Sequence, residues 1–260
     1  MKRINLLWTG GLDSTFRLVE LAHNEIEIQP YYIDDNSRPS NKNEKKAMKK
    51  IQQLLRKKPF TKAVIKDVKF ISVDEVSIRP EIKEARENLY KINEFGSQYI
   101  ILASFASQNN LQLEVGLESS DRSKATEILK RFGFLQLTSY TPVHVFNIDN
   151  WATHYKIDSD KANNDVVNIF QNLRFPAHLF NIEKIDEAEL LNKWNCTDIL
   201  KTTWFCHNPI LGIPCGHCSP CKDAINEDMA WRVPKIGRVL GGLRYNFYKA
   251  CGKVKKQFIK

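Results

Sequence analysis

The sequence predicts an α/β fold in which a parallel sheet carries helices on both faces. Apolar runs of strand length alternate with stretches of helical periodicity up to residue 117, and such alternation is typical of strands joined by crossover helices. The first apolar run, residues 4–8, passes through a pair of glycines into an amphipathic stretch. This order is typical of a buried strand, a tight loop and a helix. A chain of 260 residues, 42% of them hydrophobic and 27% charged, can bury the core of such a fold.

The expected elements follow one another in order. Strands are expected near residues 3–8, 26–33, 67–73 and 111–117, and helices near residues 14–24, 43–57, 81–93 and 97–109. In the second helix, Ala47, Ile51, Leu54 and Leu55 recur at helical spacing and predict a core-facing stripe, while the lysines around them predict a charged outer face. Ligands of parallel sheets bind beyond the carboxyl ends of the strands, so we expect the site there.

The glycine pair belongs to a candidate phosphate-binding loop. Gly10 and Gly11 let the backbone turn tightly and leave N–H groups open to an anion. The helix that follows adds its positive dipole end and unpaired N–H groups, and the hydroxyls of Thr9, Ser14 and Thr15 add further donors. The loop therefore predicts a site for the pyrophosphate end of ATP. The alternative is an ordinary turn followed by a helix N-cap.

Four cysteines form a second candidate site. Two Cys-x2-Cys steps share one loop with the spacing C-x8-C-x2-C-x2-C, at positions Cys206, Cys215, Cys218 and Cys221. Four thiolates at this spacing predict a closed, structural zinc site. An iron–sulfur cluster is the alternative, although the C-x3-C-P continuation of the bacterial ferredoxin pattern is missing. Disulfides are not expected in a chain that reads as cytoplasmic, so Cys196 and Cys251 are expected to be free thiols.

Together the two motifs resemble those of a known family. The loop is similar to the PP-loop, Ser-Gly-Gly-x-Asp-Ser, of ATP pyrophosphatases, with Thr9 in place of the first serine. A PP-loop followed by this cysteine pattern resembles the 7-cyano-7-deazaguanine synthases, over roughly residues 3–118 and 174–226. The resemblance implies an enzyme that uses ATP, Mg²⁺ and zinc. Such enzymes adenylate the carboxylate of 7-carboxy-7-deazaguanine, pass it to ammonia and dehydrate the amide to a nitrile, a step toward queuosine.

The resemblance also implies residue roles. The backbone around Gly10 to Ser14 would hold the ATP phosphates, Asp13 would orient Mg²⁺, and Asp13 and Ser14 are the candidate catalytic residues. Tyr32 and Ile33 would flank adenine. The full set of candidate nucleotide-binding residues is Trp8, Thr9, Gly10, Gly11, Leu12, Asp13, Ser14, Thr15, Tyr32 and Ile33.

The substrate side departs from the family's pattern. Residues 34–40, 94–98 and 118–122 stand where the family carries its Gln-Arg-His-like, Pro-Gly-Arg-Asn-like and Ser-Gly-Tyr-Pro-Asp-like segments. The chain is therefore expected to be a paralogue that acts on a related deazapurine carboxylate. Glu118 and Asp121 are candidate substrate or metal contacts, the alternative being ordinary surface carboxylates. Lys184 is similar to a family lysine, although it is two residues out of step.

Charge is concentrated at the C-terminal end. The formal net charge is +9, and no acidic residue follows Asp228. The nine basic residues after it account for the whole excess, namely Arg232, Lys235, Arg238, Arg244, Lys249, Lys253, Lys255, Lys256 and Lys260. Aromatic residues lie among them. Such a segment can hold nucleic acid, an anionic membrane surface or an acidic partner, and the alternative is a solvated, partly helical tail.

Three functions remain open, and one division of the chain into domains is expected. The first is an ATP-dependent ligase that joins a carboxylate to ammonia or another amine, the second a PP-loop tRNA sulfur transferase, and the third a non-catalytic nucleotide-binding subunit. The expected domains are an ATP-binding domain at 1–200 with an insertion at about 119–175, a zinc knuckle at 201–228 and a basic aromatic tail at 229–260. No apolar run reaches the roughly 18 residues of a membrane span, a cytoplasmic location is expected, and a homodimer is an open alternative.

Overall fold

The computed structural model describes residues 1–35, 38–117, 124–140 and 151–251. The candidate contacts Glu118 and Asp121 lie outside these residues, as does the tail from residue 252. The chain divides into two compact units. The first comprises residues 1–8, 13–34 and 56–183, and the second comprises residues 9–12, 35–55 and 184–260. The domain boundaries expected at residues 200 and 228 stay predictions.

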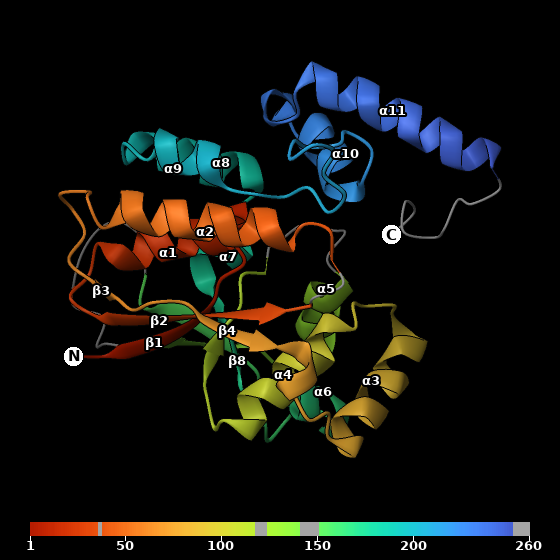
Figure 1. The fold of residues 1–260 in the computed structure, drawn as a ribbon. Coiled ribbons are helices and arrows are strands. Elements are labelled where there is room, and N and C mark those ends of the chain that lie inside the picture. Colours follow the sequence, from red (N-terminus) through yellow and green to blue (C-terminus); the bar gives the residue numbers. More distant parts are fainter. Residues whose placement is uncertain (36–37, 118–123, 141–150, 252–260) are drawn as a thin grey trace. The chain divides into compact units, whose positions relative to one another are not determined.

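The first unit contains a mostly parallel sheet (Figure 1). Its strand order is β3-β2-β1-β5-β8-β7-β6, and β4 also pairs with β2. Pairing is parallel from β3 to β8 and antiparallel for β8–β7 and β7–β6. The strands are β1 Arg3–Leu7, β2 Glu27–Asp34, β3 Val64–Ile65, β4 Lys69–Ser72, β5 Leu113–Glu114, β6 Gln136–Ser139, β7 Thr153–Lys156 and β8 Leu173–Pro176.

Helices lie on both faces of this sheet. Figure 1 shows α1 and α7 on one face and α3, α4 and α6 on the other. Their side chains on the second face join the strands in one apolar core, which includes Leu89, Phe105 and Phe170. The helices of this unit are α1 Leu12–Ala22 (whose first residue belongs to the second unit), α3 Pro80–Ile92, α4 Gln98–Gln108, α5 Lys124–Phe132, α6 Asn164–Phe170 and α7 Ala177–Asn181, with a 3-10 turn at Val73–Glu75.

The α/β fold and the order of its first elements are confirmed. Each expected strand and helix up to residue 117 has a counterpart, although the fourth strand is only Leu113–Glu114. The short β3 was missed, because two residues carry no readable periodicity. Within the expected insertion, β8 pairs with β5 and continues the parallel part of the sheet.

A buried ionic network holds α1 to the centre of the sheet. Arg17 is fully buried and donates two hydrogen bonds to Glu114 of β5, each 2.8 Å long. It also donates to Glu20, one turn further along α1, at 2.6 Å. Glu20 is 3.0 Å from Nδ1 of His178 in α7, and the Tyr140 hydroxyl donates to Glu114 at 2.8 Å. The two buried carboxylates therefore share one guanidinium between a helix and a strand.

The network sets the ionisation of its members. Burial acts to raise the pKa of Glu20, but the attraction of Arg17 and the hydrogen bond from His178 outweigh it and lower the pKa. Burial acts to lower the pKa of Arg17, while Glu114 and Glu20 together raise it above its ordinary value. Both groups are therefore charged at neutral pH, and each compensates the cost of burying the other.

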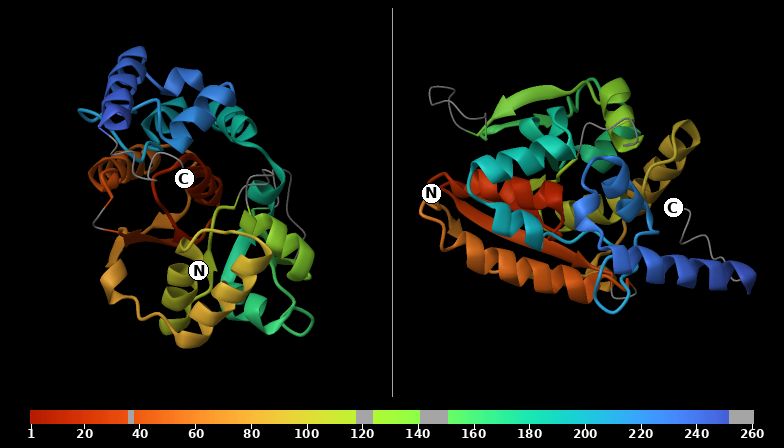
Figure 2. Two further views of the ribbon diagram at one scale, coloured as in Figure 1. Left: turned by 90° about the vertical axis from the view of Figure 1, so that its right-hand side faces the viewer. Right: turned by 90° about the horizontal axis from the view of Figure 1, so that it is seen from above.

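The second unit is helical. Its helices are α2 Asn41–Leu55, α8 Lys184–Lys193, α9 Thr197–Thr202, α10 Ser219–Asn226 and α11 Lys235–Ala250, with a 3-10 turn at Ala230–Arg232. The stripe expected in α2 is confirmed for Ala47, Ile51 and Leu55, which are buried together with Met48, whereas Leu54 is half-buried. α9 packs against α2 and α8. Figure 2 shows α10 beside the N-terminal half of α11. Among the described helices, none combines the length and apolar character needed to span a bilayer.

We predict that removing the Arg17 side chain is far more costly than removing a surface arginine. Arg17→Met leaves two buried carboxylates without their cation and should lower the free energy of unfolding by about 3–5 kcal/mol. Arg3→Ala is the control, because the pair between Arg3 and Glu27 is solvent-exposed on the arginine side and should be worth less than about 1 kcal/mol. Urea denaturation measures both.

A second comparison separates charge from packing. Adding Glu114→Gln to Arg17→Met removes one of the stranded charges and should recover part of the lost stability. Equal losses for Arg17→Met and Arg3→Ala would contradict the role given to the network.

Candidate functional site

The four cysteines near the C-terminal end come together in the second unit. The sulfur atoms of Cys206, Cys215, Cys218 and Cys221 all lie within 4.8 Å of one another, and all four residues are buried. The loop between them brings this about, because Gly216 has a φ of +74°, a conformation that glycine adopts without strain. α10 begins directly after Cys218 and carries Cys221 on its first turn.

The geometry of this quartet fits a metal such as zinc. Zinc–sulfur bonds of about 2.3 Å in a tetrahedron place sulfur atoms about 3.8 Å apart, and the sulfur atoms of Cys206 and Cys218 are 3.8 Å apart. Backbone N–H groups also point at the sulfurs. The Cys215 N–H donates to Cys206 at 3.2 Å, and the N–H groups of His217 and Cys218 donate to Cys215 at 3.4 Å each. Such donors stabilise negative charge on sulfur.

The thiols of the quartet differ in ionisation. Hydrogen bonds from the other cysteines, Cys206 first, lower the pKa of Cys215, and a bond from the His217 N–H adds to this effect. The hydrogen bond with Cys206 also lowers the pKa of Cys218 to about 7. Hydrogen bonding within the quartet raises the pKa of Cys206 and Cys221. The quartet thus contains thiols that ionise readily, and the thiolate is the form that binds metal.

The backbone of α11 lies directly on the cysteine loop. A Cβ atom added to Gly237 would lie 2.0 Å from the Pro214 carbonyl oxygen, and one added to Gly241 would lie 1.9 Å from the Cys215 carbonyl oxygen. Neither position leaves room for a side chain. The two glycines are one helical turn apart, so they present a single flat strip of backbone to the loop.

Two arginines of α11 form hydrogen bonds with backbone carbonyls near the start of the helix and in the cysteine loop. Arg238 donates to the carbonyls of Val233 and Ala230, and Arg244 donates to the Asn208 carbonyl at 2.7 Å. His217 lies 3.1 Å from the Arg238 carbonyl through Nε2, and its ring stacks on Tyr245. Arg238 therefore binds the turn that precedes α11, and Arg244 binds the segment between Cys206 and Cys215.

The glycine loop turns tightly at Gly10. Gly10 has a φ of +72°, and a Cβ added to it would lie 3.0 Å from Met48 Cγ and 3.2 Å from the Glu44 carbonyl oxygen. Glycine is therefore required here both by conformation and by space. The Gly11 N–H donates to the Thr9 hydroxyl over 3.4 Å. Thr9–Leu12 belong to the second unit, and Asp13 and Ser14 belong to the first.

Trp204 connects the two loops within the second unit. Its backbone N–H donates to the Gly10 carbonyl at 2.8 Å, while its indole N–H donates to the Cys206 carbonyl at 2.8 Å. One residue thus fixes the glycine loop to the first cysteine of the quartet. No local pattern in the sequence predicts this link, because Gly10 and Trp204 lie about two hundred residues apart.

The other candidate nucleotide contacts lie in the first unit. Trp8 and Thr15 are fully buried, and the Trp8 indole N–H donates to the Thr15 hydroxyl at 3.0 Å. This bond joins the two flanks of the glycine loop. Tyr32 is fully buried and Ile33 half-buried at the end of β2. Gly116 lies beside Asp13 and Ser14 at the start of α1, as expected for a loop after a neighbouring strand. The predicted contacts of these residues with ATP stay predictions.

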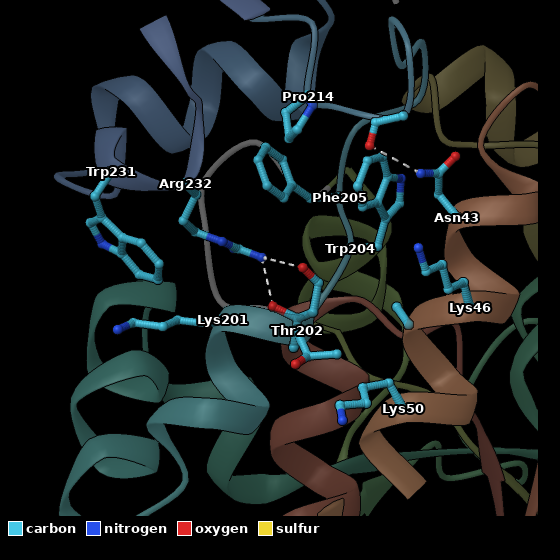
Figure 3. A pocket seen from close by; sticks show the side chains of 13 residues that line it. Asn43, Lys46, Lys50, Lys201, Thr202, Trp204, Phe205, Pro214, Trp231 and Arg232 are labelled. Carbon is cyan, nitrogen blue, oxygen red and sulfur yellow. Dashed lines mark hydrogen bonds between the residues drawn. The ribbon is translucent and has the colours of Figure 1, made fainter. Parts of the chain in front are cut away.

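A pocket that the sequence did not indicate lies in the second unit (Figure 3). It has a volume of about 320 Å³ and is formed by α2, the end of α9, the segment leading to the cysteines and the turn before α11. Aromatic and basic side chains line it, among them Lys46, Lys50, Lys201, Trp204, Phe205, Trp231 and Arg232. The cysteine loop supports one wall, because Phe205 and Pro214 each precede a cysteine of the quartet.

Comparison with known proteins adds no family to this picture. No known family model matches the chain, and no curated protein matches its sequence significantly. The arguments on function therefore depend on the residues and their arrangement.

We predict that the quartet binds one metal ion per chain and that the ion stabilises the loop. Cys218→Ser should lower the bound metal, measured by elemental mass spectrometry, and the melting temperature together, because structural zinc contributes about 10–16 kcal/mol in small domains. Cys251→Ser is the matched control, since Cys251 is exposed and lies outside the quartet. Full metal content in the Cys218 variant would rule out its role as a ligand.

We also predict that the contact between α11 and the cysteine loop tolerates no side chain at Gly241. Gly241→Ala should lower the melting temperature and the metal content, because its methyl group would overlap the Cys215 carbonyl oxygen. Gly242→Ala is the control, since its methyl group would lie 3.3 Å from Nε2 and 3.6 Å from Cε1 of the His217 ring and would meet no backbone atom at closer range. A Gly241 variant as stable as the Gly242 variant would show that α11 can shift away from the cysteine loop without loss of stability, and would contradict the prediction.

Proposed function

We propose that the chain is an ATP-dependent ligase that adenylates a carboxylate and transfers it to an amine. A carboxylate oxygen would attack the α-phosphorus of ATP, forming a carbon–oxygen–phosphorus link and expelling pyrophosphate. The amine nitrogen would then attack the activated carbonyl carbon and expel AMP. By the resemblance of its motifs, the carboxylate is 7-carboxy-7-deazaguanine or a related deazapurine, and the amine is ammonia or a primary amine.

The observation that carries this proposal is the glycine loop. It directly follows β1 and precedes α1, and Gly10 holds a conformation and a space that only glycine fits. A loop of this kind at a helix N-terminus favours phosphate binding, because backbone N–H groups and the helix dipole both attract anions. The hydrogen bond from Trp204 to the Gly10 carbonyl helps to hold the turn in place before ATP binds.

Roles follow for the chain's own residues. The backbone N–H groups of the loop would bind the phosphates, and the Ser14 hydroxyl would add a donor at the start of α1. Asp13 would orient Mg²⁺, a cation that prefers carboxylate and phosphate oxygens and that lowers the charge repelling the incoming carboxylate. Rate enhancement would come mainly from positioning and charge neutralisation.

We propose that the metal of the quartet is zinc and that its role is structural. Four cysteine ligands leave no open coordination position for a substrate. Burial of all four thiols also weighs against the alternative of a tRNA sulfur transferase in which these cysteines carry sulfur, since such a thiol must reach its substrate.

We predict that Asp13→Ala abolishes AMP formation while the protein stays folded. The assay is mass spectrometry of the products after incubation with ATP, Mg²⁺, 7-carboxy-7-deazaguanine and ammonium, together with ATP–pyrophosphate exchange. Loss of a charge-neutralising ligand should cost at least about a hundredfold in rate. Asp67→Ala is the control, because the Asp67 side chain is exposed and pairs only at the surface, with Arg56.

The outcomes separate the functions. Unchanged AMP release in the Asp13 variant would remove the loop from the mechanism. Binding of ATP by the unaltered protein without exchange for any carboxylate would favour a non-catalytic nucleotide-binding subunit.

A further inference from the structure

The pocket of the second unit has an uncompensated positive charge. Lys46 and Lys50 lie one turn apart on α2, Lys201 lies near the end of α9, and all three are exposed. Among the residues lining the pocket in the described part of the chain there is no carboxylate. Within the described residues, none of these three lysines forms an ion pair with a carboxylate. Such a pocket attracts an anion, because its charge is balanced only by solvent ions.

The Arg232 side chain is held against the pocket wall by two contacts. It donates to the Thr203 hydroxyl at 2.7 Å, and its guanidinium lies 4.4 Å from the centre of the Phe205 ring. Its charge therefore adds to the positive potential from a fixed position, while the lysines across the pocket stay mobile enough to adjust to a ligand.

The aromatic residues offer flat faces. Trp231 is 51% exposed, which is unusual for a residue with so much apolar surface. Figure 3 shows Trp231 and Arg232 on one side of the pocket and Lys46 and Lys50 on the other. The Trp204 ring is held by the bond from its indole N–H to the Cys206 carbonyl, so its orientation is fixed before any ligand arrives.

We propose that this pocket binds a nucleotide unit, with its base stacked on the indoles and its phosphate held by Lys46 and Lys50. Aromatic faces beside cations are the usual means of binding single-stranded nucleic acid, and a volume of about 320 Å³ is in the range of small-ligand sites. The unit can come from a free nucleotide or from a single strand. Trp231 and Arg232 belong to the segment that carries the chain's whole excess of positive charge, which suits a strand with many phosphates.

This site is distinct from the glycine loop, although Trp204, which lines the pocket, also donates its backbone N–H to the Gly10 carbonyl. Both involve α2, but on different sides of the helix. Glu44 and Met48 lie against Gly10, whereas Asn43, Lys46 and Lys50 line the pocket. The proposal therefore does not depend on ATP-dependent catalysis, and the two can fail independently.

The test measures binding of a labelled oligouridine of about ten nucleotides by fluorescence anisotropy over a range of salt concentrations. Lys46→Ala combined with Lys50→Ala should weaken binding about tenfold and lower the salt slope by about 0.7, the amount that one neutralised phosphate of a single strand contributes. The matched control is Lys42→Ala combined with Lys49→Ala, two exposed lysines of the same helix outside the pocket. It should change affinity less than about twofold.

A second pair tests stacking. Trp231→Ala should weaken binding about tenfold without changing the salt slope, because it removes a ring and no charge. Phe134→Ala is its control, an exposed aromatic residue of the first unit. Circular dichroism melting of each variant shows that the fold is kept.

A further arm distinguishes the two sources of the nucleotide. Uridine monophosphate that binds as tightly as the oligomer, with the same losses in the variants, would support a free nucleotide; much tighter binding of the oligomer would support a strand. Asp13→Ala should bind either probe normally. Absence of binding by both probes, or equal losses in the pocket and control variants, would overturn the proposal.

Discussion

The two hydrogen bonds of Trp204 are the constraint on which the second unit's functional features depend. Its backbone N–H holds the Gly10 carbonyl and its indole N–H holds the Cys206 carbonyl. The glycine loop, the cysteine quartet and the aromatic wall of the pocket are therefore parts of one hydrogen-bonded assembly. A metal ion held by the quartet would add to the precision of the glycine loop, which contains no metal ligand, because it would fix the Cys206 carbonyl to which the indole is bound.

In the first unit the corresponding constraint is ionic. Arg17 lies in the middle of α1 and satisfies carboxylates on β5 and on its own helix. An ion pair of this kind adds little net stability compared with an apolar core, but it defines which helix face meets which strand, since any other placement leaves a charge buried alone. The fixed start of α1 is the result, and Asp13 and Ser14 lie at that start.

Local order in the sequence explains why part of the structure could be predicted. The strand, glycine loop and first helix follow from neighbouring residues, and the cysteine quartet follows from spacing within sixteen positions. The Arg17–Glu114 pair and the Trp204–Gly10 bond join residues far apart in the chain, so no local pattern shows them. Two local signals in the sequence point to further contacts. Arg17 and Glu20 are the charged residues in the otherwise apolar run 16–22, and Gly237 and Gly241 are spaced by one turn, a spacing that allows close backbone approach.

The contact between the Gly237 and Gly241 backbone and the cysteine loop has a consequence for biosynthesis. α11 is translated after all four cysteines, so during synthesis the nascent loop is complete in ligands before its cover exists. A metal ion that binds at that stage would meet the four thiols before α11 packs against the Pro214 and Cys215 carbonyls. In the mature protein, exchange of the ion would then require α11 to detach from the cysteine loop. The rate of this detachment, and not the breaking of metal–sulfur bonds, would limit how fast the ion is lost.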